Sequence, residues 1–284
     1  MRFQRKMLFR NALNVKDDLM NLDKAGKLYW DHRWKNTLLP ELINPYRSGP
    51  DNYLDRKFHD FFRGVFSDWE TNNKRLLEIG CARSVWLPYF AKQFGFKVYG
   101  IDYSERGCQQ AMELLSNQGI KGEIVCADFF SPPESMLGEF DVVVSFGVLE
   151  HFEDTDGCVL AFSQFLRKKG IMITNIPNLS GLIGLIQKCI NRDILDIHVP
   201  LSRENVLEVH QKNRLFPVSC DYFLVANFGV LNFEHLGGTF IYEWILQSFC
   251  WLNRIIWFVE KLINMKPNRW SSPYVNCVAI KLPE

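Results

Sequence analysis

The chain has 284 residues, enough to bury one large core, and a formal net charge of +1 at pH 7. Its Lys and Arg residues are scattered, so we expect no nucleic-acid partner. Eight single cysteines without a CxxC pair or a Cys/His metal spacing suit buried thiols in a reducing compartment. No apolar segment of the signal-peptide kind follows the basic N-terminus, and we therefore expect a cytoplasmic protein.

The N-terminal segment, residues 1–70, is predicted to form a helical cap. Residues 54–69, LDRKFHDFFRGVFSDW, repeat apolar side chains at helical spacing and so present one apolar face. A loop rich in Pro, Gly and Asn separates them from KLYWDHRWKNTLLPELI at 27–43. This upstream stretch is rich in aromatic residues and is also expected to be helical.

The remainder, residues 71–284, is predicted to be one domain with its core at 74–178. Short apolar runs alternate here with helical stretches, which predicts an α/β fold with a doubly wound parallel sheet. The runs are hydrophobic throughout, as expected of strands that are covered on both faces. They are RLLEIG (75–80), KVYGID (97–102), GEIVCAD (122–128), FDVVVSFG (140–147) and GIMITNIP (170–177).

We predict that this domain is completed by two insertions on the substrate side, 179–215 and 232–268, and by a final strand at 273–282. SRENVLEVH reads as a helix capped by Ser202, although Glu204 does not occupy the capping-box position. FPVSCDYFLVANFG reads as a further strand.

Residues 240–265 are predicted to form a long helix that is apolar around most of its circumference. Its longest uncharged run, 244–253, is too short to span a bilayer. We expect this helix to pack into the protein or to form a homodimer interface. The alternative is peripheral membrane contact, in which 240–265 and LSGLIGLIQKCI (179–190) form a hydrophobic cap for a lipid-linked acceptor.

The ends of the predicted strands carry residues suited to ligand binding, because open parallel sheets bind ligands beyond the carboxyl ends of their strands. Gly80 begins the loop GCARS after the first strand, and Asp102 ends the second strand. A carboxylate at this place can accept both hydroxyls of a ribose. NAD and S-adenosylmethionine both contain that ribose, so the spacing alone leaves both cofactors open.

Two features favour S-adenosylmethionine over NAD. A loop that cradles a pyrophosphate is expected to read G-x-G-x-x-G, whereas Ala82 and Ser84 occupy the later small positions here. An aminoacyl tail brings no pyrophosphate close to the loop, so Ala and Ser are easier to accept. Asp128 after the third strand can also accept from an adenine amino group, with Phe129 beside the ring.

The motifs LEIGCARS, VYGIDYS, VCADFF, FDVVVSFGVLEHFED and KKGIMITNIPN, in this order, resemble the class I S-adenosylmethionine-dependent methyltransferases. They are most similar to the branch that includes ubiquinone-biosynthesis-type and sugar or natural-product O-methyltransferases. The resemblance covers residues 74–178, and SPYVNCVAIKLP near the C-terminus resembles the last, antiparallel strand of the family. It implies a Rossmann-like, seven-stranded sheet and a small-molecule acceptor that is methylated at oxygen.

The resemblance also implies where the ligands lie. The methionine part of the cofactor is expected to contact Glu78, Gly80, Cys81 and Ala82, and the ribose to contact Asp102 and Tyr103. The adenine is expected to contact Asp128 and Phe129. At the end of the fourth strand, Ser145 and Phe146 are expected to pass near the methionine part. YWDHRW resembles N-terminal segments that close over the cofactor in this branch. Its residues Tyr29, Trp30 and Trp34 are therefore expected to contact the substrate.

Several of these residues also have purely structural interpretations. Gly80 could serve only as a turn, Asp128 only as a helix cap and Glu78 only as the partner of a backbone amide. Ala82 and Ser84 depart from the glycines that the family usually has there. They favour an alternative function, a catalytically degenerate domain that binds a partner or a membrane through its apolar C-terminal region.

Methyl transfer to oxygen requires proximity and, where the hydroxyl is not acidic, a base. His151 follows the fourth strand, and His198 lies on a segment expected to cover the site, so both are candidate bases. A structural hydrogen bond is the alternative role for each. Glu150, His151 and Asp154 resemble the metal ligands of some relatives, but no second histidine is near them in the sequence, and we predict no metal.

Overall fold

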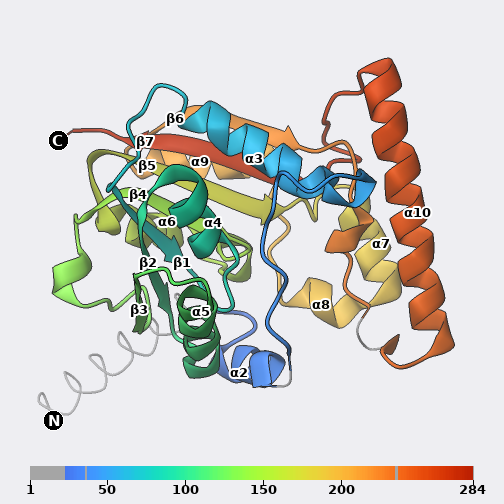
Figure 1. The fold of residues 1–284 in the computed structure, drawn as a ribbon, viewed down its shortest axis with the longest axis horizontal. Coiled ribbons are helices and arrows are strands. Elements are labelled where there is room, and N and C mark those ends of the chain that lie inside the picture. Colours follow the sequence, from blue (N-terminus) through green and yellow to red (C-terminus); the bar gives the residue numbers. More distant parts are fainter. Residues whose placement is uncertain (1–22, 36, 234–235, 284) are drawn as a thin grey trace, which may run out of the picture.

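The computed structural model describes residues 23–35, 37–233 and 236–283. Within them, seven strands form one sheet with the order β3-β2-β1-β4-β5-β7-β6 (Figure 1). The strands are β1 (Arg75–Ile79), β2 (Lys97–Asp102), β3 (Gly122–Cys126), β4 (Phe140–Phe146), β5 (Leu166–Pro177), β6 (Leu215–Phe223) and β7 (Tyr274–Lys281). The last strand, β7, runs antiparallel to both β5 and β6. The predicted Rossmann-like sheet is therefore confirmed.

Of the helices in the described residues, two precede β1, three connect strands between β1 and β5, and four follow β5. They are α2 (Lys27–Lys35), α3 (Tyr53–Val65), α4 (Trp86–Phe94), α5 (Glu105–Asn117), α6 (Thr155–Phe165), α7 (Leu182–Ile190), α8 (Arg192–Asp196), α9 (Arg203–Lys212) and α10 (Phe240–Ile263). Short 3-10 helices are η1 (Pro50–Asn52), η2 (Glu134–Met136), η3 (Leu149–His151) and η4 (Phe228–Val230).

The central strands bury side chains on both faces. In β1, Leu77 and Ile79 join a core that includes residues of α6 and α9, whereas Leu76 joins a core shared with α3, α4 and α5. Phe62 of α3 and Phe90 of α4 are fully buried in the second core. Because helices cover both faces, the strands are hydrophobic throughout, as the sequence indicates. The domain boundary near residue 70 stays a prediction.

β1 and β4 are parallel neighbours from which the chain proceeds toward opposite edges of the sheet. It passes from β1 to β2 and β3 on one side, and from β4 to β5 on the other. Their register pairs Glu78 with Val144 and Ile79 with Ser145, so the loops that follow both strands begin side by side. Loops that diverge at such a switch point leave a crevice for ligands.

Helix α9 begins where the sequence predicts, but its cap is more complete than expected. The Ser202 hydroxyl accepts from the Asn205 backbone amide at 3.2 Å, and the Asn205 side chain accepts from the Ser202 amide at 2.9 Å. Asn205 thus closes the capping box that Glu204 could not close. Asparagine is outside the usual Glu/Gln pattern, which explains why the motif was missed.

The long apolar helix predicted at 240–265 is present as α10 and stands at one side of the molecule (Figure 1). One face of its N-terminal half packs against α7 and η4 in a third, small core centred on Ile183, Leu231 and Phe233. Buried positions of α10 are restricted to Asn253 and Trp257 among the residues whose burial is described. Among the described helices, none has the length and apolar character needed to cross a bilayer.

Candidate active site

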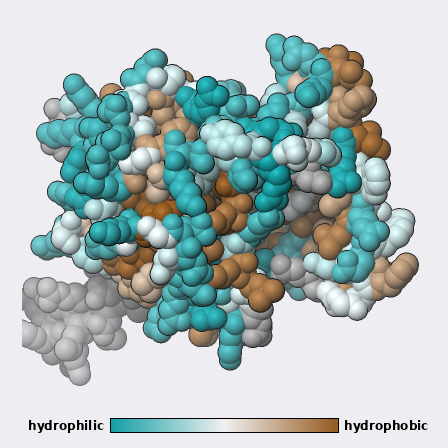
Figure 2. Space-filling view, in the orientation of Figure 1, coloured by the Kyte–Doolittle hydropathy of each residue, from teal (hydrophilic) through white to brown (hydrophobic). Residues whose placement is uncertain are grey.

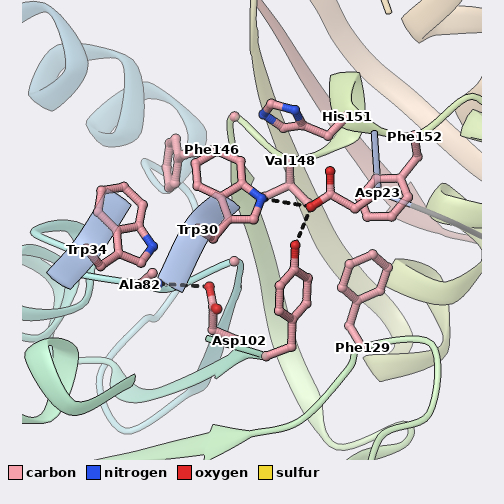
Figure 3. Close-up of a pocket in the computed structure, with 13 residues that line it drawn as sticks. Asp23, Trp30, Trp34, Ala82, Asp102, Phe129, Phe146, Val148, His151 and Phe152 are labelled. Atoms are coloured by element: carbon pink, nitrogen blue, oxygen red, sulfur yellow. Dashed lines mark hydrogen bonds between the residues drawn. The ribbon is translucent and has the colours of Figure 1, made fainter. Parts of the chain in front are cut away.

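A cavity of about 210 Å³ lies at the carboxyl ends of β1 and β4 (Figure 3). Nine predicted site residues line it: Trp30, Trp34, Gly80, Ala82, Asp102, Tyr103, Phe129, Phe146 and His151. Four further lining residues were not predicted: Asp23, Gly147, Val148 and Phe152. The walls thus come from α2, from the ends of the first four strands with the residues that follow them, and from the chain just before α2.

Gly80 makes the turn that opens the cavity. Its φ of +73° lies in the left-handed region, and a Cβ at this position would stand 2.4 Å from Cγ2 of Val148. Its amide donates to the Ile101 carbonyl at 2.9 Å, which ties the turn to β2. Glycine is therefore required both by the backbone conformation and by the close approach of the loop after β4.

Asp102 connects the loops that follow β1 and β2. One carboxylate oxygen accepts from the Ala82 amide at 3.1 Å (Figure 3), and the other accepts from the Ser104 amide at 2.7 Å. Burial raises the pKa of Asp102 to about 6, and the two amides oppose that shift. The group is therefore ionised at neutral pH, and each oxygen keeps a lone pair for a ligand hydroxyl.

Ser84, the departure from the family pattern, has a clear structural role. Its hydroxyl donates to the buried Glu78 carboxylate and accepts from the amides of Trp86 at 3.0 Å and Leu87 at 3.2 Å. It therefore holds the first turn of α4 and the carboxylate together. Burial raises the pKa of Glu78 to about 8, against the lowering effect of the Ser84 hydrogen bond. Glu78 lies behind the cavity wall, and its partner is a hydroxyl rather than a backbone amide.

Ala82 and Cys81 complete this loop in different ways. Ala82 lines the cavity and packs on α5, where a Cβ added at Gly107 would stand 2.4 Å from its methyl group. Cys81 is fully buried, and its sulfur fills the space beside Gly100 of β2. The predicted cofactor contact of Ala82 thus fits its position, whereas the Cys81 side chain lies outside the cavity lining.

The aromatic N-terminal segment covers the cavity, as the resemblance implies. Trp30 and Trp34 of α2 stack with their ring centroids 5.7 Å apart, and both line the cavity. Tyr29 contacts the edge of Trp30 from outside the lining. Asp23 accepts from the Trp30 indole at 2.7 Å and from the Tyr103 hydroxyl (Figure 3). This carboxylate, which was not predicted, fixes the cover to the end of β2.

The wall at the ends of β3 and β4 is aromatic. Phe129 is buried and meets Phe152 edge-on, with ring centroids 5.4 Å apart. Asp128 is exposed and accepts from the Phe130 amide at 2.9 Å, so it lies outside the lining and acts there as a turn residue. The Ser145 hydroxyl is buried without a hydrogen-bond partner among the described residues.

The two candidate bases lie together. His151 and His198 are separated by 47 positions in the chain, yet their ring centroids are 4.4 Å apart. Nδ1 of His151 faces the Ile197 carbonyl at 2.9 Å, and Nδ1 of His198 faces the Ile194 carbonyl at 2.5 Å. A carbonyl can only accept, so each Nδ1 carries the proton and each Nε2 keeps its lone pair.

Both histidines are kept neutral by their surroundings. Burial lowers the pKa of His151, and Asp23 opposes that shift. Burial and the neighbouring His151 lower the pKa of His198 to about 4. Of the two rings, only that of His151 lines the cavity. His151 is therefore the better placed to receive a proton from a bound acceptor.

Glu150 adds a carboxylate to the two histidines. One oxygen of Glu150 and one nitrogen of each ring lie within 4.8 Å of one another. Burial raises the pKa of Glu150 to about 8, and its Oε2 has no partner among the described residues. His198, which is distant in sequence, supplies a second histidine to this group, so the reason given for predicting no metal was wrong. Asp154 instead caps α6 by accepting from the Gly157 amide at 2.9 Å.

The lining fits the ligand implied by the sequence. Gly80 keeps one wall open, Asp102 supplies an ionised carboxylate, and Phe129 with Phe152 supplies apolar rings. The doubly wound sheet with an antiparallel final strand and a cavity at the switch point defines a class I S-adenosylmethionine-dependent methyltransferase fold.

Comparison with known proteins agrees. The chain belongs to the methyltransferase domain family, whose sequence profile matches residues 50–215. It is 27% identical over 164 residues to a ubiquinone biosynthesis O-methyltransferase of Pelagibacter ubique, covering 57% of this chain and 64% of the relative. A protein described in the same words from Aromatoleum aromaticum is 31% identical over 163 residues, covering 56% and 62%. The chain thus spans slightly less than two thirds of these relatives.

Solved structures share the fold over most of the chain. One is a putative sarcosine dimethylglycine methyltransferase from Galdieria sulphuraria, with a TM-score of 0.59 and 10% identity, covering 90% of this chain and 98% of that one. Another is geranyl diphosphate C-methyltransferase from Streptomyces coelicolor, in complex with S-adenosyl-L-homocysteine, with a TM-score of 0.55 and 15% identity. This match covers 89% of the present chain and 96% of the other. At these identities the likeness concerns the fold.

Proposed function

We propose that the protein transfers a methyl group from S-adenosylmethionine to an oxygen of a small-molecule acceptor. The observation that carries the proposal is a single cavity that joins the ribose-type carboxylate Asp102 to the unprotonated Nε2 of His151. The ubiquinone biosynthesis O-methyltransferase relatives favour oxygen as the accepting atom. The acceptor class proposed from the sequence, a sugar, lipid-linked or natural-product substrate, is consistent with the aromatic lining.

The residues that would hold the cofactor are those at the strand ends. Asp102 would accept from the ribose hydroxyls, Phe129 would pack on the adenine, and the backbone of Gly80 to Ala82 would face the aminoacyl tail. When bound, S-adenosylmethionine supplies an electrophilic methyl group on a sulfonium. Trp30 and Trp34 cover part of the cavity, and the Asp23 hydrogen bonds hold this cover in place, which would limit the access of water to the site.

His151 would act on the acceptor. Its Nδ1 proton is engaged by the Ile197 carbonyl, so the ring cannot turn without losing a hydrogen bond in a buried place. Its Nε2 is therefore fixed as an acceptor and would take the hydroxyl proton as the acceptor oxygen bonds to the methyl carbon, whose bond to sulfur breaks and leaves a neutral thioether. The neighbouring His198 is a positioning residue, because it packs on His151 and lies outside the cavity lining.

The alternative of a degenerate, non-catalytic domain rested on Ala82 and Ser84. In the structure, Ser84 holds Glu78 and the start of α4, and the Ala82 methyl fits against Gly107. Both residues are thus accommodated without closing the cavity. The two departures from the family pattern give no reason to expect that binding has been lost.

The test is transfer of label from methyl-labelled S-adenosylmethionine to extracted metabolites, followed by identification of the labelled product. We expect one product class from the wild type and almost none from Asp102→Ala. His151→Gln should reduce turnover by about 100-fold, the scale of a lost general base, whereas cofactor affinity should be kept. His32→Gln, at an exposed histidine of α2, serves as the control. Equal loss in both histidine variants, or no transfer by the wild type, would contradict the proposal.

A further inference from the structure

Helix α10 is fixed to the body of the protein by one face only. The Asn253 side chain accepts from the Phe228 amide at 2.9 Å, and the Trp257 indole donates to the Ala226 carbonyl at 2.9 Å. Glu260 pairs with Lys57 of α3 at 2.7 Å. These specific contacts determine how α10 is rotated about its axis, and therefore which of its side chains face outward.

The outward face of α10 is apolar and exposed. Seven of its large side chains are each 58–67% exposed: Ile241, Trp244, Trp251, Ile255, Phe258, Leu262 and Ile263. At 100° per residue, they fall within an uncharged arc of roughly 140°. Figure 2 shows hydrophobic side chains along the outer edge of the molecule, where Figure 1 places the C-terminal half of α10. Contiguous exposure of this extent marks an interaction surface.

Basic residues border the arc. Arg254 and Lys261 fall on the polar stripe next to it, together with the acidic Glu243, and the Arg254 guanidinium lies over the Trp251 ring at 5.3 Å. Lys266 and Arg269 follow the helix, and the Arg269 guanidinium lies over the exposed Trp270 ring at 4.5 Å. Tryptophan beside Lys and Arg is the combination found at the headgroup level of membranes.

A groove on the flank of α10 continues this positive charge. It lies between α3 and the C-terminal half of α10 and has a volume of about 720 Å³. Four basic side chains line it, against two acidic ones: Arg56, Lys57, Arg254 and Lys261, with Asp60 and Glu260. Phe258 lines the same groove and also belongs to the outward arc. Positive charge and apolar surface are thus continuous at this place.

We propose that the outward face of α10 and its basic flank dock on an anionic lipid bilayer. A second copy of the chain is less well suited, because a helix–helix seam is a narrow apolar stripe, whereas this arc is wider and carries large aromatic rings. The helix lies along the bilayer surface, with Trp244 and Trp251 at the depth of the headgroups. This inference does not depend on the proposed reaction, because none of these residues lines the cavity at β1 and β4.

Vesicle flotation of the full chain tests the proposal. We expect the wild type to bind phosphatidylcholine vesicles that contain phosphatidylglycerol, and to bind pure phosphatidylcholine more weakly. Trp251→Glu with Ile255→Glu should lower the partition coefficient at least about tenfold, because two apolar side chains are lost from the bilayer. Lys261→Glu should lower it at least about fivefold on anionic vesicles at low salt, and less at high salt.

Matched controls lie on other helices. Met112→Glu on α5 and Leu160→Glu on α6 change apolar side chains of similar exposure, and Lys121→Glu changes an exposed lysine. They should leave vesicle binding unchanged, and calorimetry should show that the α10 variants keep their S-adenosylmethionine affinity. No binding by the wild type, or equal losses in the controls, would overturn the proposal. So would a dimer in solution that Trp251→Glu with Ile255→Glu dissociates, because a second copy would then cover the face.

Discussion

Replacing Gly80 by alanine is expected to disturb the turn at the centre of the site. The left-handed backbone costs an L-residue about 1–2 kcal/mol, and forcing a methyl group against packed atoms adds about 1–3 kcal/mol. The new Cβ would stand 2.4 Å from Cγ2 of Val148, far inside contact distance. We therefore expect Gly80→Ala to lower the free energy of unfolding by about 2–5 kcal/mol and to weaken cofactor binding.

Two further variants separate the backbone term from the clash. Gly119 also has a positive φ, of +65°, but a Cβ there would meet nothing within 4 Å. Gly119→Ala should therefore lose only about 1–2 kcal/mol. Val148→Ala removes the colliding methyl group, so Gly80→Ala with Val148→Ala should be less destabilised than the sum of the single variants.

Urea denaturation of the four variants and the wild type measures these differences. Equal losses for Gly80→Ala and Gly119→Ala, together with strict additivity in the double variant, would refute the close approach of the two loops. Calorimetric titration with S-adenosylmethionine on the folded variants reports the second effect. Binding by Gly80→Ala as tight as that of the wild type would show that this turn does not face the cofactor.

Other predictions concern the groups around the cavity. Ser84→Ala should lower the free energy of unfolding by about 1–3 kcal/mol in urea denaturation, because it leaves Glu78 buried without its hydroxyl partner and uncaps α4. Turnover should rise with pH through the pKa of His151, which lies below the ordinary histidine value of 6.5, and then level off. His151→Gln should abolish this rise. A rise that persists in the variant would exclude His151 as the base. Cofactor affinity should fall separately below about pH 6, where Asp102 becomes protonated, and an affinity flat from pH 7 to 5 would contradict that role. Turnover unchanged by a chelator and by added Mg²⁺ or Zn²⁺ is expected of a base mechanism, whereas loss and metal-specific recovery would assign Glu150, His151 and His198 as ligands.

The sheet and most of the cavity lining could be predicted because they depend on local patterns. Each buried strand is a short apolar run, and a parallel sheet brings the ends of such runs to one edge. Gly80, Asp102 and Phe129 were therefore found from their places after strands. Asp128 occupies the same kind of place, but the Phe130 amide is its partner.

What the sequence left open depends on contacts between distant segments. Asp23 reaches Tyr103 across 80 positions, and no periodic pattern near residue 23 indicates such a partner. His198 meets His151 only because the chain after α8 returns to η3, where the Val199 amide donates to the Glu150 carbonyl at 2.6 Å. Such meetings follow from tertiary packing rather than from local sequence.

Calorimetric titration of the wild type with S-adenosylmethionine, S-adenosylhomocysteine and NAD tests the central claim most directly. We expect both sulfur ligands to bind with one-to-one stoichiometry, NAD to give no heat of binding, and Asp102→Ala to weaken both sulfur ligands at least about tenfold, the effect of losing hydrogen bonds to a charged group. Binding of NAD in place of the sulfur ligands, or sulfur-ligand affinities that Asp102→Ala leaves unchanged, would contradict the account.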